Sequence, residues 1–124
     1  MTVLTEGAHP GAFIMSEADW HRSRDTITIV AGSGVVKPGT VLGKVTASGK
    51  FAPSPATGSD GAQTGVAINI YGVDATSVDV KVAAFTRDAE VNGNCLFYAA
   101  SVDDDTKKAA KATQLAAVGI IVRT

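Results

Sequence analysis

Apolar and polar side chains alternate in three stretches of the chain, residues 25–29, 66–71 and 78–83. In the first stretch, Ile27 and Ile29 alternate with threonines. A period of two residues is typical of a β-strand that packs one face against a core and exposes the other. Residues 41–46 and 89–98 are apolar but less regular, and we expect strands there as well. The pattern predicts a mainly β domain.

Glycine, proline and small polar residues separate the expected strands. Residues 37–39, with the sequence KPG, predict a turn, because proline fixes φ and glycine tolerates conformations closed to other residues. Apart from two prolines, residues 52–65 carry no apolar side chain larger than alanine, so we expect a long exposed loop. Residues 92–94, with the sequence NGN, fit either a hairpin turn or a bulge.

The chain closes with SVDDDTKKAAKATQLAAVGIIVRT, and its three consecutive aspartates are candidates for a cation site. A calcium loop of the helix-loop-helix kind spaces its acidic ligands at alternate positions around a glycine and ends with a glutamate. Here the acids are adjacent, no glycine follows before Gly119, and no glutamate follows at all. The spacing therefore argues against a metal site.

The same segment has the pattern of a capped helix. Asp103 and Asp104 are the candidate cap residues, because a carboxylate there accepts a hydrogen bond from a free N–H and suits the helix dipole. Each lies four residues before a lysine, Lys107 or Lys108, in the favourable order for an ion pair. Three alanines at helical spacing predict a thin apolar stripe that packs on a sheet: Ala109, Ala112 and Ala116. Residues 120–122 then predict a final strand.

Residues 1–24 show no sustained period of either 2 or 3.6, and we expect them to form an extended N-terminal arm. The arm contains Phe13, Ile14, Met15 and Trp20, whereas disordered tails are poor in such residues. Something should therefore bury part of it. A partner protein and the chain's own domain, residues 25–124, are equally good candidates on composition alone.

Composition and charge narrow the partners. A chain of 124 residues fits one domain, and its net charge of −1 gives no general attraction to nucleic acid or to an anionic membrane. No apolar run approaches the roughly 18 residues that span a bilayer, and the first residues lack a secretory signal pattern. We therefore expect intracellular synthesis. Cys95, the only cysteine, lies in an apolar run and is expected to be a buried structural thiol.

Candidate catalytic residues are few. Both histidines, His9 and His21, lie in the expected arm, where the fixed geometry that catalysis needs is hard to hold. The glycines of residues 32–34 lack the lysine and hydroxyl residue of a phosphate-binding loop. We expect no enzymatic activity, no cofactor and no metal.

The order of three stretches resembles the bacteriophage head decoration proteins of the lambda protein D type. These stretches are AFIMSEADWHRSRDTITI with VVKPGTVLGKVTASGKF, then TGVAINIYGVDATSVDVKVAAFTRDAEVNG, and finally DDDTKKAAKATQLAAVGIIV. Together they cover most of the chain. The resemblance implies a non-enzymatic protein of the β-clip fold on the outer surface of the virion. It also implies a homotrimer that binds three-fold sites of the expanded head and stabilises it against the pressure of packaged DNA.

The resemblance further implies that the N-terminal arm pairs with a strand of the major capsid protein, with no direct contact to nucleic acid. Strand addition of this kind supplies backbone hydrogen bonds, while alternate side chains fill pockets. On this hypothesis the capsid-binding residues are Phe13, Ile14, Met15 and Trp20. The arm is richer in apolar residues than the resemblance leads us to expect of the shortest family members.

A second hypothesis from another class is a small-ligand or carbohydrate-binding β module of a phage or bacterial assembly. In that case the loop of residues 52–65 would act as a lid. Such a site needs a concave pocket, usually with aromatic side chains. The chain has one tryptophan, two tyrosines and four phenylalanines, which is a thin supply for such a lining.

Overall fold

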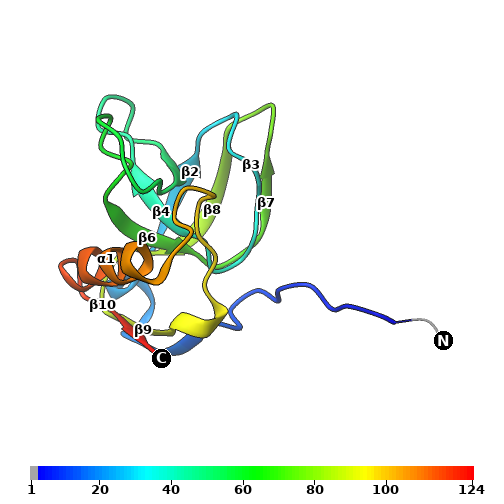
Figure 1. The fold of residues 1–124 in the computed structure, drawn as a ribbon, viewed down its shortest axis with the longest axis vertical. Helices are drawn as coiled ribbons and strands as arrows, with labels where there is room; N and C mark the ends of the chain where they lie inside the picture. Colours follow the sequence, from blue (N-terminus) through cyan, green and yellow to red (C-terminus); the bar gives the residue numbers. More distant parts are fainter. Residues whose placement is uncertain (1–2) are drawn as a thin grey trace.

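The computed structural model describes residues 3–124 and shows a β domain with one α-helix near its C-terminus (Figure 1). The first two residues of the predicted arm lie outside the described residues. The elements, in chain order, are β1 (Ile14–Glu17), η1 (Trp20–Arg22), β2 (Arg24–Ile29), β3 (Gly34–Val36), β4 (Val41–Lys44), β5 (Phe51–Pro53), β6 (Gly65–Asn69), β7 (Val73–Ala75), β8 (Val80–Phe85), β9 (Ala89–Asn92), η2 (Gly93–Cys95), α1 (Asp105–Ala116) and β10 (Ile120–Arg123). The prediction of a mainly β fold with one short C-terminal helix is confirmed.

Five strands close into a barrel in the order β2-β5-β4-β6-β8. Its longest pairing is the antiparallel ladder of β2 and β8, which runs from Arg24 opposite Phe85 to Ile29 opposite Val80. The alternating stretches predicted β2, β6 and β8 to within two residues at each end. β2 buries one face, as the alternation indicates, whereas β6 buries Ala67 and Asn69 on one face as well as Ile68 on the other. The barrel core contains nine buried residues: Ile27, Ile29, Val36, Leu42, Phe51, Ala67, Ala75, Val82 and Ala84.

A three-stranded sheet in the order β1-β9-β10 lies beside the barrel, and β3 and β7 form a separate two-stranded sheet. β1 pairs with β9 in antiparallel fashion, and β10 pairs with β9 in parallel. The NGN segment forms neither the hairpin turn nor the bulge expected from the sequence. It leads into the short 3-10 helix η2, whose N-cap Asn92 accepts a hydrogen bond from the Asn94 N–H at 3.0 Å.

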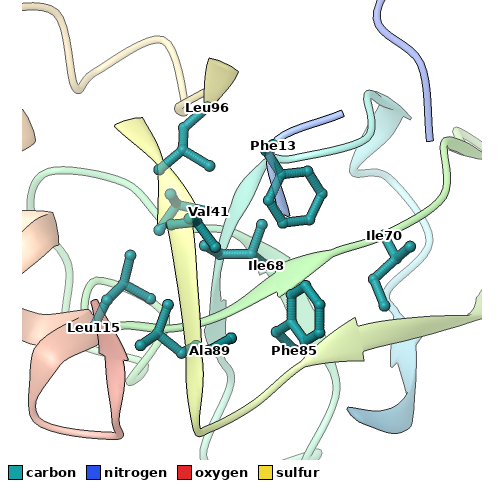
Figure 2. Packing of buried hydrophobic residues seen from close by; sticks show 10 residues of the cluster. Phe13, Val41, Ile68, Ile70, Phe85, Ala89, Leu96 and Leu115 are labelled. Atoms are coloured by element: carbon teal, nitrogen blue, oxygen red, sulfur yellow. The ribbon is translucent and has the colours of Figure 1, made fainter. Parts of the chain in front are cut away.

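A second hydrophobic core joins this sheet, the barrel and α1. Its buried members are Phe13, Val41, Ile68, Ile70, Phe85, Ala89, Val91, Leu96, Leu115 and Ile120. Figure 2 shows the rings of Phe13 and Phe85 near each other, with Ile68 and Ile70 on either side. The two rings meet edge to face, with 5.8 Å between their centroids. Residue 13, from the predicted arm, is therefore part of the domain's own core.

Helix α1 begins after Asp104, the N-cap residue, whose carboxylate accepts a hydrogen bond from the Lys107 N–H at 2.8 Å. Asp103 pairs instead with the Lys107 ammonium at 2.8 Å. The predicted packing of the alanine stripe is wrong. The buried residues of α1 are Lys111 and Leu115, because a leucine gains more from burial than an alanine and so sets which face of the helix turns inward.

The loop between β5 and β6 was expected to be exposed throughout, and this expectation is wrong at both of its ends. Ser54 and Ala62 are buried, and Lys111 reaches into the loop from α1. The Lys111 ammonium donates hydrogen bonds to Ser54 Oγ at 2.7 Å, to the Pro55 carbonyl at 2.6 Å and to the Gln63 carbonyl at 2.5 Å. The buried ammonium of Lys111 thus holds the β5–β6 loop against α1.

Candidate functional site

Residues 3–10 are exposed along their whole length and extend away from the domain as the blue end of the ribbon (Figure 1). The apolar side chains of Val3 and Leu4 are almost fully exposed, Leu4 by 89%. The root of this segment meets the domain where the Gly11 N–H donates to the Ile70 carbonyl at 3.3 Å. We call residues 3–12 the N-terminal segment.

The four predicted arm residues fall into two groups. Phe13 is 1% exposed in the second core, and Ile14 is half-buried against it. Met15 and Trp20 are exposed. The composition left open whether a partner or the chain's own domain buries the arm. The structure shows that the chain's own domain buries Phe13 and partly buries Ile14, the first residue of β1. The predicted arm therefore has an extended part, residues 3–12, and a part that lies on the domain, residues 13–24, which we call the docked part.

Trp20 is the largest exposed apolar side chain of the docked part, with 65% of its surface accessible. It begins η1 and has a φ of +37°, in a region that residues other than glycine seldom adopt. Tyr71, at the end of the alternating stretch around β6, is 49% exposed. The two aromatic residues border a hollow of about 360 Å³, which we call the Trp20 pocket; Arg24, Thr26 and Ala83 are among its other lining residues.

The charged groups around the Trp20 pocket are paired within the chain. The Arg24 guanidinium donates through Nε to Glu17 Oε2 at 2.7 Å and through a second nitrogen to Glu17 Oε1. Hydrogen bonds from Arg24, and to a smaller extent from Ser23, hold the pKa of Glu17 below its usual value. Asp25 accepts from Arg87 at 2.6 Å, and this hydrogen bond is the main cause of its lowered pKa. The pocket is therefore close to neutral.

Other candidate chemistry is sparse in the described part of the chain. His9 lies 2.9 Å from Glu6, whereas His21 packs edge to face on Trp20. Cys95 is half-buried rather than buried, although it does pack against the second core. Within residues 3–124, no group of three histidine, cysteine, aspartate or glutamate side chains is placed to hold a metal ion. No helix in this range is long and apolar enough to cross a membrane.

A second hollow, of about 540 Å³, lies between α1 and β10. Leu96, Tyr98, Lys108 and Val122 contribute to its lining, with Tyr98 the single aromatic residue. None of its lining residues comes from the loop that was expected to act as a lid over a small ligand. The Lys111 hydrogen bonds hold that loop elsewhere on α1.

Sequence reasoning singled out Trp20 but missed Tyr71 and Lys111. Tyr71 occupies a polar position of an alternating strand pattern, and an aromatic residue at such a position is a signal of an exposed contact. Lys111 gave no signal, because lysine is usually exposed. The fold brings Trp20 and Tyr71 together from elements about fifty residues apart.

The described residues thus define a small β-barrel protein that presents an exposed apolar segment and an aromatic pocket, the features of a protein that binds other proteins. The model of the family "Bacteriophage lambda head decoration protein D" matches residues 3–120, and the chain belongs to this family. A search of curated proteins found no match. The resemblance expected from the sequence is confirmed. Family membership gives the chain a role in phage capsid decoration, as a structural protein located in the virion capsid.

Proposed function

We propose that the protein binds as a homotrimer at three-fold sites on the outer surface of the expanded phage head and stabilises the head against the pressure of packaged DNA. In this proposal the N-terminal segment pairs with a strand of the major capsid protein, and the domain adopts the β-clip arrangement of its family. The observation that carries the proposal is the exposed apolar N-terminal segment, in a chain that belongs to a capsid decoration family.

The segment suits strand addition because its backbone makes few hydrogen bonds within the described residues. Its backbone contacts are the Gly11–Ile70 bond at the root, a turn in which the Ala12 N–H donates to the His9 carbonyl at 3.2 Å, and a second turn in which the Gly11 carbonyl accepts from the Ile14 N–H at 3.1 Å. Pairing with an open strand edge would satisfy the remaining backbone groups. Because successive side chains of a strand point to opposite faces, one of the two exposed apolar residues, Val3 or Leu4, would then fill a pocket on the capsid protein.

The docked part positions the N-terminal segment relative to the domain. Phe13 and Ile14 fix the point where the segment leaves the domain, because they pack into or against the second core. Met15 and Trp20 remain available for direct contact with the shell. The four residues named from the sequence would therefore contribute in two ways, the first pair by positioning and the second pair by contact.

The energetics favour several segments acting together. Ordering a residue costs about 1–2 kcal/mol of backbone entropy, so the ten residues 3–12 cost roughly 10–20 kcal/mol, and one segment alone binds weakly. In a trimer, the first bound segment raises the effective concentration of the other two. Avidity of this kind exceeds single-segment affinity by about 10²–10⁴-fold.

The test is co-sedimentation of two proteins, the full chain and a variant lacking residues 1–12, with expanded and unexpanded heads. The truncation stops before Phe13, so it leaves the second core intact. We expect the full chain to prefer expanded heads and the truncated variant to bind them at least 100-fold more weakly. Light scattering should give a trimer for both proteins.

Two results would contradict the proposal. Full occupancy of expanded heads by the truncated variant would remove the segment from the binding mechanism. A monomeric full chain would remove the avidity on which the energetics depend. A melting temperature equal to that of the full chain serves as the folding control for the truncated variant.

A further inference from the structure

Trp20 combines backbone strain with exposure. Its φ of +37° lies in the left-handed region, where a side chain is unfavourable and glycine is not. Within the chain its ring meets the edge of His21 at 5.8 Å and the Arg24 guanidinium at 5.8 Å, yet 65% of the residue stays accessible. A strained and exposed aromatic residue gains little from its own domain, which points to a contact outside it.

The Trp20 pocket gives this contact a shape. Tyr71 lines the pocket together with Trp20, and strands β2 and β8 contribute Thr26 and Ala83, which lie opposite each other in the ladder. These strands belong to the closed barrel, so this part of the pocket lies on a rigid base. A preformed pocket of about 360 Å³ binds a side chain with a smaller entropy cost than a segment that must first be ordered.

The charges around the pocket select a neutral occupant. Arg24 already lies 5.8 Å from the centre of the Trp20 ring, so an incoming cation would meet a like charge. An incoming anion would have to compete with Glu17, which accepts two hydrogen bonds from Arg24. Asp25 is likewise held by Arg87. An apolar side chain displaces water from two aromatic surfaces without disturbing either ion pair.

One lining residue of the pocket, Tyr71, lies next in the chain to the residue that holds the root of the N-terminal segment. The Gly11 N–H bonds to the Ile70 carbonyl, and Tyr71 is the next residue along the chain. A partner protein that pairs with the N-terminal segment therefore lies close enough to the Trp20 pocket to place a side chain in it. We propose that the Trp20 pocket receives an apolar side chain of the major capsid protein, as a second and rigid anchor beside the segment. This inference rests on the proposed function, because it uses the same partner.

Trp20→Gly separates the contact from folding. Glycine is unstrained at φ +37°, so we expect an equal or higher melting temperature than wild type. Loss of the ring should weaken binding to expanded heads at least tenfold. Val78→Ala is the matched control, since Val78 is also an exposed apolar residue but does not line the pocket; its binding should equal that of wild type.

Four binding outcomes have distinct meanings. Weaker binding by Trp20→Gly, with an unchanged trimer mass and an unlowered melting temperature, supports the proposal. Equal binding by wild type and Trp20→Gly overturns it while leaving the proposed function intact. A Trp20→Gly variant that loses its trimer assigns the pocket to a second copy of the chain and also overturns it. Failure of the wild type to bind expanded heads overturns the proposed function and this inference together.

Discussion

Lys111→Met tests whether the buried ammonium holds the β5–β6 loop on α1. Lys111 is 2% exposed and has three acceptors, none of which is a carboxylate. Methionine keeps most of the apolar stem but has no N–H group. The Ser54 hydroxyl retains the hydrogen bond that it donates to the Ala62 carbonyl at 2.7 Å. The carbonyls of Pro55 and Gln63 lose the ammonium as their donor.

The magnitude follows from those two carbonyls. A buried polar group without a partner costs about 1–3 kcal/mol, so the two carbonyls together should lower the free energy of unfolding by roughly 2–6 kcal/mol. Removing the charge also removes the cost of burying it, and that cost is real, because burial lowers the pKa of Lys111. We therefore expect a net loss of about 2–4 kcal/mol in the free energy of unfolding. At roughly 3–5 °C per kcal/mol for a domain of this length, the melting temperature falls by about 6–20 °C.

The assay is urea unfolding of the wild type, Lys111→Met and Lys107→Met. Lys107 lies on the same helix and pairs with Asp103 at the surface, where water screens the pair, so its replacement should leave the stability close to that of the wild type. The reasoning is refuted if Lys111→Met is as stable as the Lys107 control. A result of that kind would mean that the desolvation of the ammonium cancels its three hydrogen bonds.

The pH dependence of the same pair of proteins has a definite sign. The pKa of Lys111 is lowered in the folded state from its ordinary value of 10.5, so just below 10.5 the unfolded chain binds a proton that the folded chain does not. Stability rises with pH wherever the unfolded state binds more protons. The contribution of Lys111 to stability should therefore increase as pH rises through that window, and Lys111→Met should lack this increase.

Two further substitutions test the local packing. A Cβ at Gly43 would lie 1.9 Å from the Ala62 carbonyl oxygen, so Gly43→Ala should displace the loop and cost roughly 1–3 kcal/mol in urea unfolding. Gly7→Ala, with no atom within 4 Å of the added Cβ, is its control, and equal losses in both would contradict the close approach. Asp104→Ala removes the N-cap of α1 and should cost about 1 kcal/mol, measured by thermal melting of the helical circular dichroism signal. An unchanged melting curve would show that the cap contributes nothing to the stability of α1.

The strands were predictable because their signal is local. β2, β6 and β8 each have apolar residues at alternate positions, and that period is visible in the sequence, although β6 and β8 lie between the two cores and bury residues on both faces. The orientation of α1 was not predictable in the same way. Its buried face carries Lys111 beside Leu115, and a lysine becomes a core residue only where a distant loop supplies acceptors. The acceptors precede Lys111 by 48 to 57 positions in the chain, and no local pattern reveals a contact over that separation.

The candidate site was predictable in composition but not in arrangement. The apolar residues of the first 24 positions marked a segment that something must bury. Only the fold separates Phe13, which packs on Phe85, from Trp20, which does not enter a core. The contact between residues 13 and 85 spans most of the chain, so it is invisible to periodicity and becomes clear once β1 pairs with β9.

The division of the N-terminal region into an extended part and a docked part has a consequence for how the protein binds. An anchor on a rigid base positions a partner at low entropy cost, whereas a segment that orders on binding gains contact area at a high cost. Phe13 joins the two parts, because its burial in the second core fixes the point from which the N-terminal segment leaves. We therefore propose an order of binding steps. The Trp20 pocket makes the first specific contact with the major capsid protein, and the N-terminal segment, now held close to its partner strand, pairs with it afterwards. Binding kinetics of Trp20→Gly should accordingly show a larger decrease in the association rate than the variant lacking residues 1–12, which should instead dissociate faster.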